Sequence, residues 1–230
     1  MELFIYRLLK HFLFGHRATT LFLRGLKQTL CREKQSHPEE LINIIKKAAA
    51  AIYTEHHTIV KDAASQGHLE FVSHILAAYN TLLPQLSSSQ VTIALLKRSM
   101  MQGFNRPSVN LPLRFMLWCC RNNPDRLKTI FSWMMKQYGA TFNWSTPYKH
   151  QPGQCKFSIE IDRCFYFEFF NRHNLPALTT VLCQLDALWF EVIDPAVHGL
   201  YFDRSCYQTQ GYGAKTCIFP IVEKRLNKLK

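Results

Sequence analysis

The sequence predicts an α+β protein, in which a helical N-terminal half is followed by a small antiparallel sheet covered by helices. Up to residue 140, apolar residues recur at helical spacing between Gly and Pro breaks, which is typical of amphipathic helices. From Cys155 to Asp162, apolar and polar residues alternate, as in a half-buried strand. The order strand, helix, helix, strand, strand then favours a sheet with helices packed on it. We expect a helical region over residues 1–140 and an α+β region over residues 141–230.

The helical half is predicted as a series of helices with short connections. Ser36 to Glu39 has the form of a capping box with Pro38 in the first turn. Gly67 and Pro84 are the expected ends of the two helices that follow, because both residue types interrupt helices. We expect helices over 2–14, 21–30, 36–64, 68–83, 89–103, 107–120 and 125–138.

The C-terminal half combines short strands with two helices. Pro176 lies in the first turn of the second helix, where a proline is well tolerated. Gly211 and Gly213 indicate a loop between the last two strands. The expected strands are 142–144, 155–162, 197–204 and 215–222, and the expected helices are 165–172 and 175–193.

The charge is strongly positive, with a formal net value of +12 from 28 basic and 16 acidic residues. Residues 1–140 hold 18 of the basic and 8 of the acidic side chains, so the excess belongs to the helical half. An anionic partner would suit this charge. The basic residues are scattered and do not interleave with aromatic residues, so we expect no specific nucleic-acid partner.

The first 30 residues place Phe and Leu on one side of the predicted helices and Lys and Arg on the other. Such a face either docks on the rest of the protein or makes a peripheral membrane contact through residues 2–30. We favour docking, since this is the usual role of an apolar stripe. Charged residues such as Arg7 and Lys10 interrupt the apolar run, so neither a signal peptide nor a membrane-spanning helix is expected.

Eight cysteines are present, without a pair at CxxC spacing. This pattern fits reduced thiols in a cytoplasmic protein better than a disulfide scaffold. Five of the eight lie between Cys155 and Val222. We therefore expect the reactive residues in this segment. The sequence does not indicate an oligomeric state.

A series of ordered motifs in this segment carries a family resemblance. The motifs are Ile161-Asp-Arg-Cys164, Phe169-Phe170 with His173, Leu178 to Leu182, Cys183-Gln-Leu-Asp186, Thr209 four residues before Gly213, and Cys217-Ile-Phe219. As a set they resemble the L-2-amino-thiazoline-4-carboxylic acid hydrolase family. The resemblance covers the part of the chain after residue 155, and the helical first half suits the variable helical region of that family.

The resemblance implies a hydrolase that opens a small cyclic amidine or thiazoline-type carboxylate without an organic cofactor. The family's reaction adds water to the carbon between the ring sulfur and nitrogen and yields an N-carbamoyl cysteine. This chemistry requires a nucleophile at that carbon, a carboxylate for the amidinium group and a cation for the substrate carboxylate. The partner implied is a small-molecule substrate.

The catalytic candidates are Cys164, Cys183, Asp186 and Cys217. Cys183 and Asp186 are three residues apart on one predicted helix and therefore share a face. A nearby carboxylate raises the pKa of a thiol, which favours Asp186 as a base or as the anchor of the amidinium. Cys164 follows Arg163 at a helix start, and both features favour a thiolate. We therefore expect Cys164 or Cys183 to be the nucleophile.

Arg163 and Arg204 are the candidates for holding the substrate carboxylate, because guanidinium binds carboxylate in a bidentate manner. Thr209 is added as a substrate-binding candidate by the family motif. The chain also departs from the family pattern, since Ile218 replaces the acidic residue after the last cysteine, and Cys206-Tyr207 replaces an Arg-Thr pair.

Other interpretations stay open at this level. A single buried cysteine is more often core filling than a catalyst. Three thiols with Asp186 or a histidine could bind zinc, although the CxxC pairing is missing and no metal is our first expectation. The departures from the family pattern also fit a non-hydrolytic ligand-binding or cyclase-like protein on the same scaffold.

Overall fold

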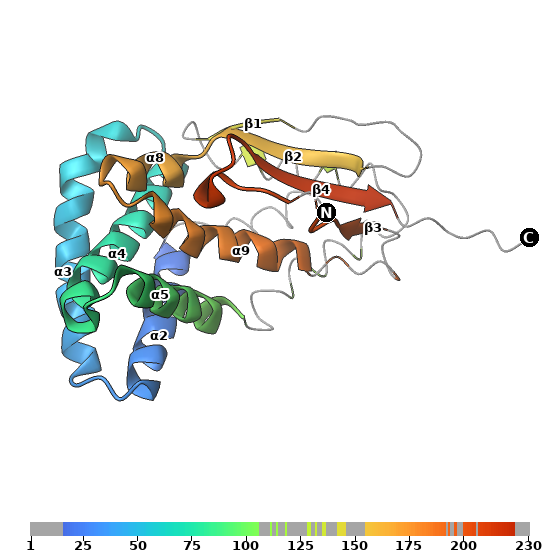
Figure 1. Ribbon diagram of the computed structural model, residues 1–230. Helices are drawn as coiled ribbons and strands as arrows, with labels where there is room; N and C mark the ends of the chain where they lie inside the picture. Colours follow the sequence, from blue (N-terminus) through green and yellow to red (C-terminus); the bar gives the residue numbers. More distant parts are fainter. Residues whose placement is uncertain are drawn as a thin grey trace, which may run out of the picture.

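The protein is described by a computed structural model that covers residues 16–105, 142–145, 155–191, 200–205 and 207–223, together with single positions between these ranges. Helices form the first part of the fold, and a small antiparallel sheet forms the second part (Figure 1). The predicted α+β class is therefore confirmed.

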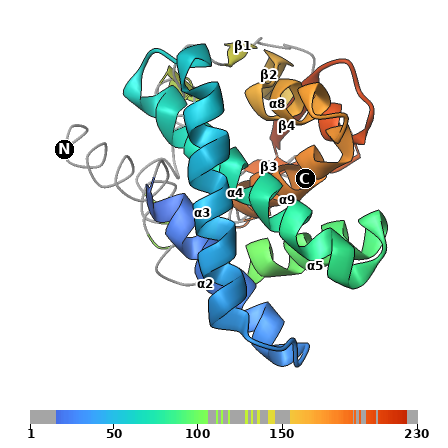
Figure 2. The same cartoon turned by 90° about the vertical axis from the view of Figure 1, so that its left-hand side faces the viewer.

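In the described residues 16–105, the first part consists of four long helices. They are α2 (His16–Arg32), α3 (Pro38–His56), α4 (Ala63–Leu86) and α5 (Ser89–Phe104), and the 3-10 turn η1 (His57–Ile59) follows α3. Helix α2 packs against α5, and α3 packs against α4, as the turned view in Figure 2 shows. The apolar side chains Phe22, Leu26 and Leu30 of α2 are fully buried, so this part of the predicted stripe docks on the protein.

Two glycines let α2 and α5 approach each other closely. A Cβ atom on Gly103 would lie 2.2 Å from the carbonyl oxygen of Leu21, and one on Gly25 would lie 2.1 Å from that of Ser99. Neither distance is compatible with a side chain at these positions. The backbones of the two helices are therefore in direct contact.

The boundaries of α3 and α4 differ from the prediction. Helix α3 ends at His56, and α4 starts at Ala63 and continues through Gly67 to Leu86. The carboxylate of Asp62 accepts the backbone N–H of Ser65 at 3.0 Å, and this N-cap fixes the start of α4 ahead of Gly67. Pro84 is accommodated in the last turn of the helix, so the predicted breaks at Gly67 and Pro84 were wrong.

The predicted capping box at the start of α3 was also wrong. His37 occupies the N-cap with left-handed backbone angles and no side-chain cap. Pro38 is nevertheless the first helical residue, as expected. The start of α5 agrees with the helix predicted over 89–103, and the hydroxyl of its N-cap residue Ser88 accepts the backbone N–H of Val91.

Four antiparallel strands form the sheet in the order β1-β2-β4-β3. They are β1 (Asn143–Ser145), β2 (Cys155–Arg163), β3 (Leu200–Phe202) and β4 (Cys217–Glu223). In the central ladder, Ile161 of β2 lies opposite Cys217 of β4. The start of β4 is therefore beside the end of β2.

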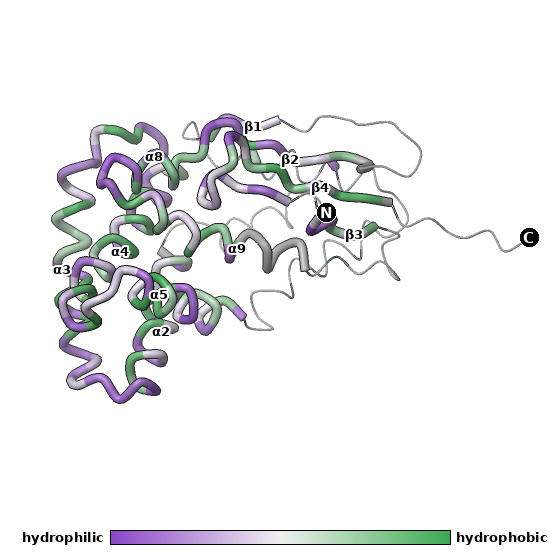
Figure 3. Tube along the Cα trace, viewed as in Figure 1, coloured by the Kyte–Doolittle hydropathy of each residue, from purple (hydrophilic) through white to green (hydrophobic). Residues whose placement is uncertain are grey.

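Helices α8 (Phe165–Arg172) and α9 (Thr179–Glu191), with the 3-10 turn η2 (Pro176–Leu178) between them, connect β2 to the rest of the sheet. Helix α9 contacts α5 on one side and β3 and the 3-10 turn η3 (Gln210–Tyr212) on the other. One continuous core runs from Phe22 in α2 to Ile221 in β4. Figure 3 shows apolar positions along much of α4 and β4, which lie in this core.

Some predicted elements fall outside the described residues. These are the helix over 2–14 and most of the helices over 107–120 and 125–138. In the ranges that are described, every helix is too short or too polar to cross a membrane.

Candidate active site

The three cysteines predicted as catalytic candidates lie close together. Cys164 occupies the N-cap position of α8, directly after β2, Cys183 lies in α9, and Cys217 is the first residue of β4. Their exposed fractions are 6%, 4% and 3%. The electrostatic environment of Cys164 includes both of the other thiols. We refer to Cys164, Cys183 and Cys217 as the thiol cluster.

The loop around η3 completes the cluster. Gly211 lies against the face of α9 that carries Thr179 and Cys183, and a Cβ on Gly211 would be 2.8 Å from Sγ of Cys183. Gly213 has a φ of 93°, which is the left-handed conformation that glycine adopts at little cost. The two glycines of the predicted loop therefore have separate tasks, close approach to α9 and chain reversal.

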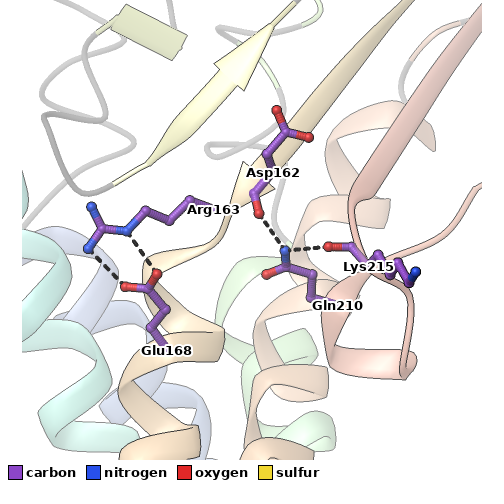
Figure 4. A network of polar contacts seen from close by, with 5 residues as sticks. All are labelled: Asp162, Arg163, Glu168, Gln210 and Lys215. Atoms are coloured by element: carbon purple, nitrogen blue, oxygen red, sulfur yellow. Dashed lines mark hydrogen bonds and ion pairs between the residues drawn. The ribbon is translucent and has the colours of Figure 1, made fainter.

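Gln210 connects the loop to both central strands (Figure 4). Its backbone N–H donates a hydrogen bond to Sγ of Cys217 at 3.3 Å. Its side-chain amide Nε2 donates to the carbonyl oxygens of Asp162 and Lys215, each at 2.8 Å. Asp162 comes two residues before Cys164, and Lys215 comes two residues before Cys217. Sequence reasoning missed Gln210, although it follows Thr209 directly in the family motif.

The environment of Cys164 keeps its proton in place. A hydrogen bond with Cys217 raises the pKa of Cys164 well above the usual value, and burial and the charge of Cys217 act in the same direction. The backbone N–H of Phe167 lowers it only in part. The thiol of Cys164 is therefore protonated despite its position at a helix start. This is opposite to the lowered pKa that we expected from the helix start and from Arg163.

Arg163 is engaged elsewhere. Its guanidinium donates two hydrogen bonds to the carboxylate of Glu168, at 2.8 and 3.0 Å, on the side away from Gln210 (Figure 4). The hydrogen bond with Glu168, followed by the charge of that carboxylate, raises the pKa of Arg163. Arg163 and Glu168 line a cavity of about 30 Å³, which is far below the size of ordinary ligand pockets.

The other two substrate-binding candidates differ from each other. Arg204 lies exposed after β3. Thr209 is fully buried directly before Gln210. Among the described residues, the hydroxyls of Thr209 and Thr179 have no hydrogen-bond partner. Buried hydroxyls normally have a partner. The hydroxyl of Thr19 in α2 also lacks one, so the two threonines near the cluster are candidates for polar contacts and no more.

Asp186 follows Cys183 by three residues in α9, while its side chain lies outside the described part of the structure. The side chains that are described include no group of three or more Cys, His, Asp or Glu residues arranged to hold a metal ion.

The family model described as L-2-amino-thiazoline-4-carboxylic acid hydrolase matches residues 119–221. The resemblance to this hydrolase family is confirmed. The matched segment contains the whole thiol cluster and Gln210, and it begins upstream of the motifs that predicted it. No curated protein and no solved structure gives a significant match to the chain.

Proposed function

We propose that the protein is a hydrolase that opens a small cyclic amidine or thiazoline-type carboxylate, with a thiol of the cluster as the nucleophile. The observation that carries this proposal is the meeting of Cys164, Cys183 and Cys217 inside the segment that matches the hydrolase family. Three thiols that come together from three separate elements support the choice of a sulfur nucleophile.

The bond changes define what the site must do. An N-carbamoyl cysteine keeps the bond between the ring nitrogen and the amidine carbon, so the bond that breaks is the one between this carbon and the ring sulfur. Attack by a protein thiolate on the amidine carbon would expel the ring sulfur and leave a covalent isothiourea. Water would then release the product and restore the thiolate.

The charged candidates have separate roles in this proposal. Asp186, in the same helix as Cys183, is the candidate for binding the amidinium group. Arg204, which is exposed after β3, and Arg163, whose guanidinium binds Glu168, are both candidates for the substrate carboxylate. The buried hydroxyls of Thr179 and Thr209 offer hydrogen bonds to the polar ring atoms.

The test is incubation of the purified protein with L-2-amino-thiazoline-4-carboxylate, with mass spectrometry of the product. We expect N-carbamoyl cysteine in amounts well above the protein concentration. Asp186→Asn should abolish turnover while the circular dichroism spectrum is kept. Cys31→Ser is the matched control, because Cys31 is exposed and lies outside the cluster.

The alternative outcomes separate the other functions. Saturable binding of the thiazoline without product would favour a ligand-binding protein. Stoichiometric zinc that is lost on substitution of the cluster cysteines would favour a metal site. If neither turnover nor binding is detected with this substrate or with other cyclic amidine carboxylates, the proposed function is wrong.

A further inference from the structure

We propose that Cys217 is the nucleophilic sulfur of the thiol cluster and that the thiol of Cys164 donates the proton to the departing ring sulfur. Gln210 is then the residue that positions this pair. The proposal rests on the proposed function, since it assigns roles within the same site. It differs from the sequence-based expectation, which favoured Cys164 or Cys183 as the nucleophile.

The hydrogen bonds around Cys217 point toward its sulfur. Sγ of Cys217 accepts the backbone N–H of Gln210 at 3.3 Å, and a second interaction joins it to the thiol of Cys164. A donor aimed at a buried sulfur stabilises its ionised form, because the donor compensates for lost hydration. Cys164 also accepts a backbone N–H, that of Phe167, but its own thiol is hydrogen-bonded to Cys217. Cys217 thus receives two donors and Cys164 one, which makes Cys217 the member of the pair that we assign the negative charge.

Gln210 fixes the spacing of the pair through its side chain. The amide Nε2 donates to Asp162 of β2 and to Lys215, which precedes β4, and both bonds are 2.8 Å long. A buried amide with two carbonyl partners holds its position firmly. The same residue therefore supplies the N–H for the sulfur of Cys217 and ties together the segments that carry Cys164 and Cys217.

Within the described part of the site, the other titratable groups near the pair are a third thiol and two exposed charged side chains. Cys183 faces the pair from α9. The carboxylate of Asp162 is exposed and meets the hydroxyl of Thr216 at 3.4 Å, and Lys215 is exposed. We assign Cys164 as the proton donor because its thiol is hydrogen-bonded to Cys217.

The reaction balances with these roles. The Cys217 thiolate bonds to the amidine carbon, the bond from this carbon to the ring sulfur breaks, and the ring sulfur takes the proton of Cys164. Water then adds to the same carbon, giving one hydrogen to the imine nitrogen and the other to Cys164. Expulsion of the Cys217 thiolate releases the N-carbamoyl product.

The test follows the thiols directly by nuclear magnetic resonance of protein labelled with ¹³C at cysteine Cβ, titrated with pH and assigned with single Cys→Ser variants. We expect Cys217 to ionise first within the cluster. We also expect Gln210→Met, which has a similar length but no amide, to raise the Cys217 midpoint by about one pH unit. Gln208→Met is the matched control, because Gln208 is exposed two residues away.

The outcomes keep the inference separate from the proposed function. Ionisation of Cys164 or Cys183 before Cys217 would overturn the inference, even if the thiazoline is hydrolysed. An unchanged Cys217 midpoint in Gln210→Met would reduce Gln210 to a merely structural role and overturn its assignment. Cys217 ionising first in a protein without turnover would support the inference and count only against the proposed substrate. Hydrolysis that survives Cys217→Ser would reject Cys217 as the nucleophile.

Discussion

Nδ1 of His68 lies 2.7 Å from the phenolic oxygen of Tyr166, and this hydrogen bond joins α4 to α8 across 98 residues of sequence. The imidazole also meets the ring of Phe142 edge-on, with ring centroids 5.2 Å apart. Burial lowers the pKa of His68 to about 4, and the charge of Asp62 opposes this effect only in part. The imidazole is therefore neutral near pH 7, and the contact between the two parts of the fold depends on that state.

The first prediction concerns acid stability. Because the unfolded histidine titrates near 6.5 and the folded one near 4, the unfolded state binds more protons between these values. Stability should therefore fall as the pH drops from 6.5 toward 4. Between pH 7 and pH 5, His68 should cost about 2 kcal/mol of the free energy of unfolding. Urea titrations at both pH values measure this change.

His68→Gln should remove most of that pH dependence, whatever it does to stability at pH 7. His57→Gln is the control, because His57 is exposed and bonds only locally to the carbonyl of Thr54. An equally steep loss of stability in His68→Gln and in the wild-type protein would contradict the assignment of the effect to His68.

The second prediction concerns the cap that sets the start of α4. Asp62→Ala removes the acceptor for the backbone N–H of Ser65 and should lower the free energy of unfolding by about 1 kcal/mol. Ser88→Ala at the start of α5 is a matched comparison. Its hydrogen bond is longer, at 3.4 Å, and exposed, so we expect a smaller loss. Chemical denaturation of both variants measures the two losses in the free energy of unfolding. A larger loss in Ser88→Ala than in Asp62→Ala would contradict this prediction.

The third prediction concerns the contact between α2 and α5. Gly103→Ala would place a methyl group 2.2 Å from the carbonyl oxygen of Leu21, so the helices would have to move apart. Overpacking of this kind typically costs about 1–3 kcal/mol. Gly25→Ala should behave similarly. A gain in thermal stability from either variant, as expected for alanine in an unpacked helix, would contradict the close contact.

The fourth prediction concerns Gly211. Gly211→Ala should destabilise the protein, since its Cβ would press on Sγ of Cys183. Cys183→Ala removes that sulfur, so the double variant should recover about 1 kcal/mol in a double-mutant cycle of unfolding free energies. Gly213→Ala provides the contrast, because the space around Gly213 is open and only its backbone angle is unfavourable. Additive effects of the Gly211 and Cys183 substitutions would show that the two do not touch.

The sequence predicted the elements whose signal is local. The alternation from Cys155 onward identified β2, and the helix predicted over 89–103 corresponds to α5. The boundary between α3 and α4 was missed because Asp62 provides a strong cap, while Gly67 costs a helix only about 1 kcal/mol. The N-cap at Asp62 thus decides where α4 begins, and Gly67 does not end the helix. The prediction had treated Gly67 as the boundary and had not considered Asp62.

The candidate site shows the same limit. The family motifs brought out Cys164, Cys183 and Cys217, which the structure places together, whereas the role of each thiol depends on contacts made in the folded chain. Gln210 was missed because its carbonyl partners lie 48 and 5 residues away. Arg163 precedes Cys164 in sequence, but its side chain turns to Glu168, so adjacency did not translate into contact.

The order of the strands has a consequence for the behaviour of the protein in concentrated solution. The long strands β2 and β4 are internal, and the border strands β1 and β3 have only three residues each. Exposed strand edges are where sheets of different molecules join and aggregate. In the described part of the chain, a sheet that ends in such short strands offers little backbone for another chain to extend, so β-pairing between molecules at these edges is disfavoured.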